Sequence, residues 1–370
     1  MKLKVFSDAT YIPAGRSHSV MLYPFWGKSL EDPGDPSSGR FDRYMATGRR
    51  FFEMTSLDQA DFAVLPVDWG SILGDAKAMD LARQFVEKAS QAGKPTVIFF
   101  WSDSDEDIPI KNVVVFRTSL YRSRRKSNEL AMPAWSEDFV SKHLRGKLPV
   151  RPKAEKPIVG FCGYAFPWEV VLRWRAREIL RRGTSLLGIR KNTSVHPLKP
   201  GHVVRAEALR FLSRSPLVRT NFIIRDRFLG GAVLPDGRTD LALMRNVRLG
   251  YLQNMIDSDY VLCSRGGGNY SYRLYETVCC GRIPIFIDTD CVLPYDFDIE
   301  WKKYCVWVDE SELPHIAEKV ARFHSDLSPG DFVELQHMCR RLWEEWLSPE
   351  GFFANFYRLF ASSYKVHQAA

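Results

Sequence analysis

The stretch that decides the fold is DYVLCSRGGGNYSYRLYETVCCGRIPIFIDTD, from Asp259 to Asp290. The apolar run Tyr260–Cys263 predicts a buried strand, and Ile283–Ile287 predicts a second one. Between them, a glycine triplet is followed by a helical pattern from Tyr272 to Cys280, with Gly281 as its stop signal. The stretch therefore predicts a strand, a loop, a helix and a strand, which together form one unit of a parallel sheet.

The loop between the two strands has the features of a phosphate-binding loop. Gly266 and Gly267 carry no side chain that would keep a ligand away from the backbone. Ser271 stands at the capping position of a helix whose N-terminal amide groups and dipole favour an anion. We expect Arg265 and Arg273 to add charge-assisted hydrogen bonds to that anion.

The same helix carries an acidic candidate for the sugar part of the ligand. Glu276 follows Arg273 by three residues, so both project from one helix face. Glu276 suits ribose hydroxyls, and Tyr272 in the first turn completes the donor-binding candidates. On this interpretation Glu276→Ala weakens donor binding and leaves the fold intact, since a helix-surface carboxylate contributes little to stability. The alternative, that Arg273 and Glu276 form a plain surface ion pair, stays open at this point.

The stretch resembles the exostosin-type glycosyltransferases. That family has a strand ending in Pro-Arg-Gly, then Ser-x-Arg-x-x-Glu-Ala, Ala-Gly-Cys-Ile-Pro-Val and an acidic turn before Leu-Pro-Phe. IVGFCGYA and ADFAVLPVDW resemble further family segments, whereas Ser264 replaces the usual proline and the first domain lacks the family's acceptor motif with His and Asp. The matching positions are Ser271, Arg273, Glu276, Gly281, Ile283, Pro284, Leu293, Pro294 and Trp301.

The resemblance implies an α/β fold of the GT-B type, with two Rossmann-like domains facing across a cleft. It also implies a nucleotide-sugar donor held by the C-terminal domain as co-substrate, a glycan or other hydroxyl acceptor, no further cofactor and no divalent metal. A UDP-sugar is the favoured donor. The alternatives are a fucosyltransferase-like GT-B enzyme that uses a GDP-sugar, or a non-catalytic protein that binds sugar or nucleic acid.

Length and patterning predict two domains in this chain of 370 residues. The polar, proline-containing segment Gly146–Pro157 reads as a linker, so we place an acceptor-side domain at 1–150 and a donor-binding domain at 151–370. Aromatic residues at helical spacing near the C-terminus predict core helices that can return to the first domain. Further expected elements are strands at Leu3–Ser7, Asp61–Val67, Thr96–Trp101, Ile158–Cys162 and Asn221–Ile224, and helices at Ala76–Gly93, Trp168–Arg182 (closed by Gly183) and Val247–Asp257.

An inverting transferase needs a general base beside the acceptor, and acidic residues follow the strand that ends at Trp101. Ligands of open α/β sheets gather beyond the carboxyl ends of the strands. Asp103 is therefore the first candidate and Asp105 the second, against the alternative of a solvated acidic loop. Lower-ranked candidates for this role are Asp68, Asp8 and His18.

The positive charge is concentrated in residues 117–191, which carry a net charge of +12 within a chain of net charge +8. This basic region is a candidate for peripheral membrane contact, although charge runs are more often solvated faces. A nucleic-acid partner is not expected, because aromatic stacking residues are not interleaved with the charges. Seven irregularly spaced cysteines indicate neither disulfides nor a zinc site, and a cytoplasmic location is expected.

Overall fold

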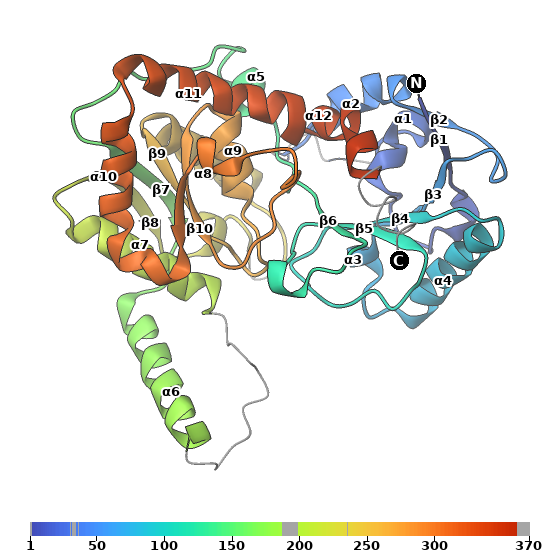
Figure 1. Cartoon of the computed structure of the whole chain (residues 1–370), viewed down its shortest axis with the longest axis horizontal. Coiled ribbons are helices and arrows are strands. Elements are labelled where there is room, and N and C mark those ends of the chain that lie inside the picture. Colours follow the sequence, from blue (N-terminus) through green and yellow to red (C-terminus); the bar gives the residue numbers. More distant parts are fainter. Residues whose placement is uncertain are drawn as a thin grey trace.

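A computed structural model of the chain describes residues 2–29, 31, 35, 37–186, 199–234 and 236–360, with the backbone only for 181–186. Two separate sheets, each composed entirely of parallel strands, form the centres of two domains (Figure 1). The predicted α/β fold of two Rossmann-like domains facing across a cleft is confirmed.

The first sheet has the strand order β2-β1-β3-β4-β5-β6. Its central strands are short and fully buried, as in β4, where all five residues are inaccessible because helices or loops cover both faces. Its strands are β1 (Leu3–Phe6), β2 (Phe52–Met54), β3 (Phe62–Val64), β4 (Thr96–Phe100), β5 (Val113–Arg117) and β6 (Glu129–Ala131). The α-helices of this half are α1 (Tyr23–Trp26), α2 (Asp42–Thr47), α3 (Trp69–Ile72), α4 (Ala76–Gln91) and α5 (Phe139–His143).

The second sheet has the order β11-β10-β9-β7-β8. Its strands are β7 (Ile158–Tyr164), β8 (Arg219–Arg225), β9 (Tyr260–Cys263), β10 (Ile283–Asp288) and β11 (Val306–Asp309). Its helices are α6 (Trp168–Leu186), α7 (Gly201–Arg214), α8 (Leu241–Ile256), α9 (Tyr272–Cys279), α10 (Ile316–Asp326), α11 (Pro329–Leu342) and α12 (Pro349–Ala354). The expected stop of α6 at Gly183 is wrong, because the helix continues through this glycine to Leu186.

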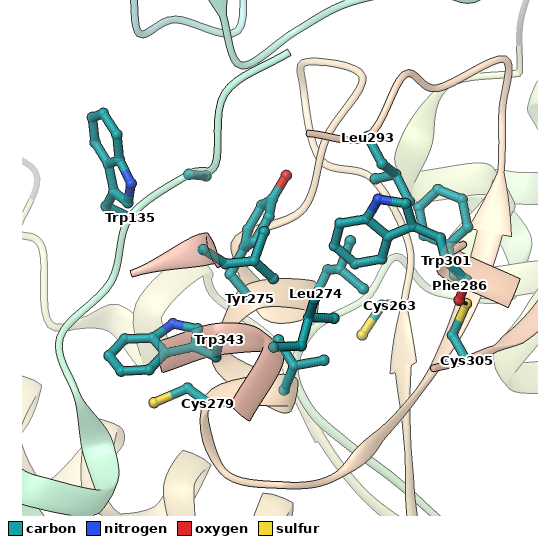
Figure 2. Packing of buried hydrophobic residues seen from close by; sticks show 14 of the residues in the cluster. Trp135, Cys263, Leu274, Tyr275, Cys279, Phe286, Leu293, Trp301, Cys305 and Trp343 are labelled. Atoms are coloured by element: carbon teal, nitrogen blue, oxygen red, sulfur yellow. Dashed lines mark hydrogen bonds between the residues drawn. The ribbon is translucent and has the colours of Figure 1, made fainter. Parts of the chain in front are cut away.

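The deciding stretch forms β9, a glycine loop, α9 and β10, as the sequence predicts. Gly281 lies between α9 and β10 with a φ of 61°, a conformation that glycine adopts without a steric penalty. Figure 2 shows Leu274 and Tyr275 of α9 enclosed by large side chains that include Trp301 and Trp343. The helix that carries the candidate donor residues is therefore firmly embedded in the core.

The C-terminal helices lead back from the second domain to the first (Figure 1). Phe353 of α12 stacks on Tyr44 with ring centroids 4.1 Å apart, and Phe356 lies 5.0 Å from the Phe116 ring. Ion pairs add to this connection, since Arg122 of the first domain reaches Asp288 at 3.0 Å. These contacts hold the two domains in a defined relative position, which fixes the space between them.

Candidate functional site

A cavity of about 660 Å³ lies between the two domains, and we call it the interdomain cavity. Its volume is in the range of sites for small molecules and cofactors. The carboxyl end of β7 contributes Gly163 and Tyr164, and the residue after β9 contributes Ser264. The cavity therefore opens where ligands of open parallel sheets are bound. Asp35, Ser37 and Arg40 of the first domain also border it.

The glycine loop meets the acidic loop of the first domain at this cavity. A Cβ atom at Gly267 would stand 2.6 Å from Asp103 Oδ2, and one at Gly268 would stand 2.8 Å from Asp103 Cα. The close approach of Asp103 therefore requires glycine at positions 267 and 268. The sequence analysis did not predict this contact. A Cβ at Gly266 would meet nothing within 4 Å, so Gly266 is the glycine of the triplet that faces open space.

Asp103 lines the interdomain cavity, whereas Asp105 does not. The Asp105 carboxylate forms an ion pair with Arg124 on the surface of the first domain. Asp8 likewise lies apart, with Lys88 at 3.0 Å. Of the acidic candidates in the first domain for the general base, Asp103 is therefore the one that faces the predicted donor residues.

The start of α9 also faces the cavity, through Ser271, Tyr272 and Arg273. Ser271 occupies the N-cap position with extended backbone angles, but its hydroxyl makes no capping hydrogen bond. Ser271 is thus the first residue before the helix, as expected, but the expected capping hydrogen bond is not formed. The first amide groups of α9 remain available to an anion. The Tyr272 hydroxyl accepts a hydrogen bond of 2.7 Å from Trp101 Nε1, which ties α9 to the first domain.

Glu276 is buried, with 4% of its surface exposed, in a network of charged and polar side chains. Arg248 donates to Glu276 Oε1 at 2.8 Å, and the Tyr251 hydroxyl donates to Oε2. Arg248 also donates to Glu137 at 2.8 Å. Burial opposes the positive charge of Arg248, but the two carboxylates outweigh it and raise the arginine's pKa well above its usual range.

This network corrects two expectations about Glu276. The side chain is not on the helix surface, and its ion-pair partner is Arg248, not Arg273. Each carboxylate oxygen accepts one hydrogen bond here and has capacity for another. Because Glu276 lines the cavity, a ligand hydroxyl can take up that remaining capacity.

Two arginines lie close together in the cavity without a carboxylate partner among the described residues. Arg273 Nη2 donates to the Cys162 carbonyl oxygen at 2.9 Å, and its guanidinium stacks 4.2 Å from the centroid of the Phe161 ring. Arg205 of α7 donates to Ser264 Oγ at 3.1 Å and to two backbone carbonyl oxygens. Burial first, and then the positive charge of Arg273, lower the pKa of Arg205 to about 10. This half-buried pair of like charges is ready to accept an anion.

Arg265 is not brought into the cavity, although it directly precedes the glycine loop. Its side chain is buried, with 7% of the residue exposed, and donates to the carbonyl oxygen of Lys199. Gly201 packs against the backbone of the same loop, since a Cβ there would lie 2.3 Å from the Gly266 carbonyl oxygen. Arg205, and not Arg265, lines the interdomain cavity beside Arg273.

A second cavity, of about 610 Å³, lies within the first domain, and we call it the first-domain cavity. Asp68 lines it and caps α3, accepting hydrogen bonds from the amides of Gly70 at 2.8 Å and Trp101 at 3.1 Å. Burial raises the pKa of Asp68 to about 6 despite these donors. His18 lines the same cavity, and its Nε2 lies 2.7 Å from the Gly27 carbonyl oxygen. Arg40 and Trp135 border both cavities.

Sequence reasoning missed four of the five arginines that line the interdomain cavity. Arg205 lies on α7, a helix that the sequence analysis does not predict because its hydrophobic periodicity is weak. Pro200 at the N-cap position of that helix was the one local signal. The missed arginines are Arg40, Arg205, Arg225 and Arg248.

Comparisons with known proteins agree with the motif. A rice protein named "Probable glucuronosyltransferase" (Oryza sativa subsp. japonica) is 39% identical over 66 residues, which is 18% of this chain and 15% of the relative. An Arabidopsis thaliana protein named "Probable beta-1,4-xylosyltransferase IRX10L" is 38% identical over 66 residues, or 18% of this chain and 16% of the relative. Exostosin-1 of Drosophila melanogaster is 27% identical over 113 residues, or 30% of this chain and 14% of the relative.

The chain carries an exostosin-type segment. The resemblance inferred from the motif is confirmed over this part, which is a small fraction of the length of the relatives. No family model matches the chain. A similar solved structure is that of TarM, with 12% sequence identity and a TM-score of 0.31, covering 76% of this chain and 58% of TarM.

Proposed function

We propose that this chain is a glycosyltransferase that takes a sugar from a nucleoside diphosphate sugar, bound in the interdomain cavity, and transfers it to a hydroxyl group of a glycan or another acceptor. The observation that carries the proposal is the pair Arg205 and Arg273. Two half-buried guanidinium groups without a carboxylate partner among the described residues repel each other, and a bound diphosphate removes this repulsion. The relatives named for sugar transfer support the same activity.

Different residues of the interdomain cavity bind different parts of the donor. The diphosphate is held by the two arginines and the first amides of α9, next to Gly266. Glu276 accepts hydrogen bonds from sugar hydroxyls, and its burial by Arg248 and Tyr251 fixes its orientation. A UDP-sugar is the proposed donor.

The reaction step follows from the position of Asp103 across the cavity. In an inverting transfer, the acceptor oxygen attacks the anomeric carbon while Asp103 takes up the hydroxyl proton. The bond between that carbon and the phosphate oxygen breaks, and the nucleoside diphosphate leaves with the bonding electrons. Arg205 and Arg273 stabilise the negative charge that develops on the leaving group.

All seven cysteines are free and buried, which fits the reducing cytoplasm that we propose as the location.

The test is a thermal-shift panel of UDP, GDP, CMP and dTDP with their sugars, since a ligand of the native state raises apparent stability. UDP compounds are expected to stabilise the protein, and a response to GDP compounds alone would favour the fucosyltransferase-like alternative. Arg205→Gln is expected to weaken donor binding by about 10- to 100-fold, because it removes charge-assisted hydrogen bonds.

The matched control for this variant is Arg210→Gln. Arg210 lies on the same helix, outside the cavity, with its guanidinium 4.0 Å above the Trp168 ring. Donor affinity should be unchanged in this control. Equal affinities in wild type and Arg205→Gln, with both proteins folded, would refute the assignment of the phosphate site.

A further inference from the structure

The basic region 117–191 divides into two parts in the structure. In its first part, 117–156, several positive charges are used within the protein: Arg117 pairs with Glu129, Arg125 with Asp296 at 2.7 Å, and Arg151 with Asp259 at 2.8 Å. With three further pairs, at least six of the eleven lysines and arginines of this part have a carboxylate partner within the protein. The second part is α6, where Arg175 pairs with Glu207 at 2.7 Å but Arg173 and Arg177 have no such partner among the described residues.

Helix α6 extends away from the body of the second domain (Figure 1). Near its start, Val171 is fully buried against Val203 and Ala206 of α7, which anchors the helix. Beyond this anchor, three large apolar side chains are exposed to solvent: Leu172 by 48%, Ile179 by 71% and Leu180 by 69%. Helices of globular proteins normally turn such residues toward a core.

The exposed apolar residues form one stripe along α6. Leu172, Ala176, Ile179 and Leu180 follow the spacing i, i+4, i+7 and i+8, which places them on the same side of a helix. Exposed arginines at 173 and 177 run beside the stripe, and neither has an ion-pair partner among the described residues. The whole helix contains five arginines and two glutamates. An apolar stripe next to a row of arginines is the pattern of a helix that lies in a membrane surface.

We propose that α6 docks this protein onto an anionic membrane surface. The stripe enters the boundary between head groups and acyl chains, and Arg173 and Arg177 contact the lipid phosphates. The charge of α6 favours anionic lipid over a second copy of the protein. Anionic lipid attracts the arginines of α6, whereas two copies of a helix with five arginines repel each other. No helix of the described ranges is long and apolar enough to cross a membrane, so the contact proposed is a peripheral one.

The experiment is co-sedimentation of the full chain with vesicles of phosphatidylcholine alone, or of phosphatidylcholine with phosphatidylglycerol. The protein is expected to bind the anionic vesicles, to bind neutral ones weakly and to dissociate as salt rises. Arg173→Gln with Arg177→Gln should weaken binding about tenfold or more, since each arginine near the surface contributes about 1 kcal/mol. Leu172→Gln, Ile179→Gln and Leu180→Gln together should abolish binding.

Leu243→Gln with Leu249→Gln is the matched control, because these leucines of α8 are also exposed but lie away from α6. Vesicle binding should be unchanged in the control. Amide hydrogen exchange of wild-type α6, which should slow when anionic vesicles are added, gives a readout that needs no variant. Absence of wild-type binding, equal loss in the control, or self-association through α6 without vesicle binding would each overturn the proposal. None of these measurements requires a sugar donor, so they are independent of the proposed activity.

Discussion

Of the described residues, those around the interdomain cavity include five arginines, three carboxylates and six aromatic side chains. Those around the first-domain cavity include two arginines, two carboxylates and five aromatic side chains other than histidine. The two cavities share Arg40 and Trp135. An excess of guanidinium groups suits a diphosphate, and aromatic walls with few charges suit the faces of sugar rings. The comparison indicates that the fold gathers an excess of positive charge where the two domains meet, whereas the positive and negative charges of the first-domain cavity balance each other.

The largest expected effect tests which carboxylate serves as the base. Asp103→Asn should lower the transfer rate by about 10² to 10⁴ and leave donor affinity unchanged, because Asn keeps the shape and loses the basicity. Asp68→Asn should lower the rate far less, since both of its carboxylate oxygens already accept backbone hydrogen bonds. Single-turnover rates with donor dissociation constants measure both. The opposite ranking of the two variants would move the base into the first-domain cavity.

A second prediction concerns the network behind the arginines. Glu276→Ala removes one of the two carboxylates that surround the half-buried Arg248 and leaves Glu137, so it should destabilise the protein by about 1 to 3 kcal/mol as well as weaken donor binding. Glu276→Gln keeps the size of the side chain and should cost less. Chemical denaturation of the three proteins checks this order. Wild-type stability in Glu276→Ala would restore the initial interpretation of a helix-surface carboxylate.

The first-domain cavity gives a prediction about pH. The pKa of Asp68 is raised by burial from 3.8 to about 6 in the folded protein. Its contribution to stability is therefore fully present below the unfolded pKa and is lost as the pH rises through about 6, a change of about 2 to 3 kcal/mol. Unfolding free energies measured across this interval should fall more steeply in wild type than in Asp68→Asn. Parallel curves would show that Asp68 is ionised like a solvated carboxyl.

The two cavities also differ in how far the sequence predicts them. The glycine loop, α9 and β10 follow local rules, because the stop at Gly281, the apolar runs and the capping position are set by neighbouring residues. The partners of Glu276 and the pair of Arg205 with Arg273 join residues far apart in the chain, and no local pattern encodes such contacts. For the same reason the sequence analysis predicts no strand at β2 and only the middle of β8. Neighbouring strands, and not periodicity, define such short or partly exposed elements.

The smallest expected effect concerns metal removal, where we expect turnover to be nearly unchanged by EDTA. A diphosphate leaving group needs positive charge near its oxygens as the bond to the sugar breaks. The interdomain cavity offers this charge through Arg205 and Arg273, which have no carboxylate to neutralise them among the described residues. The first amides of α9 add the positive end of a helix dipole. Turnover should therefore fall with Arg205→Gln and not with chelation. Measuring the two treatments side by side compares the arginines with a metal ion as the source of positive charge. Activity that is lost in EDTA and restored by magnesium or manganese would show that the arginines alone do not balance the phosphate charge.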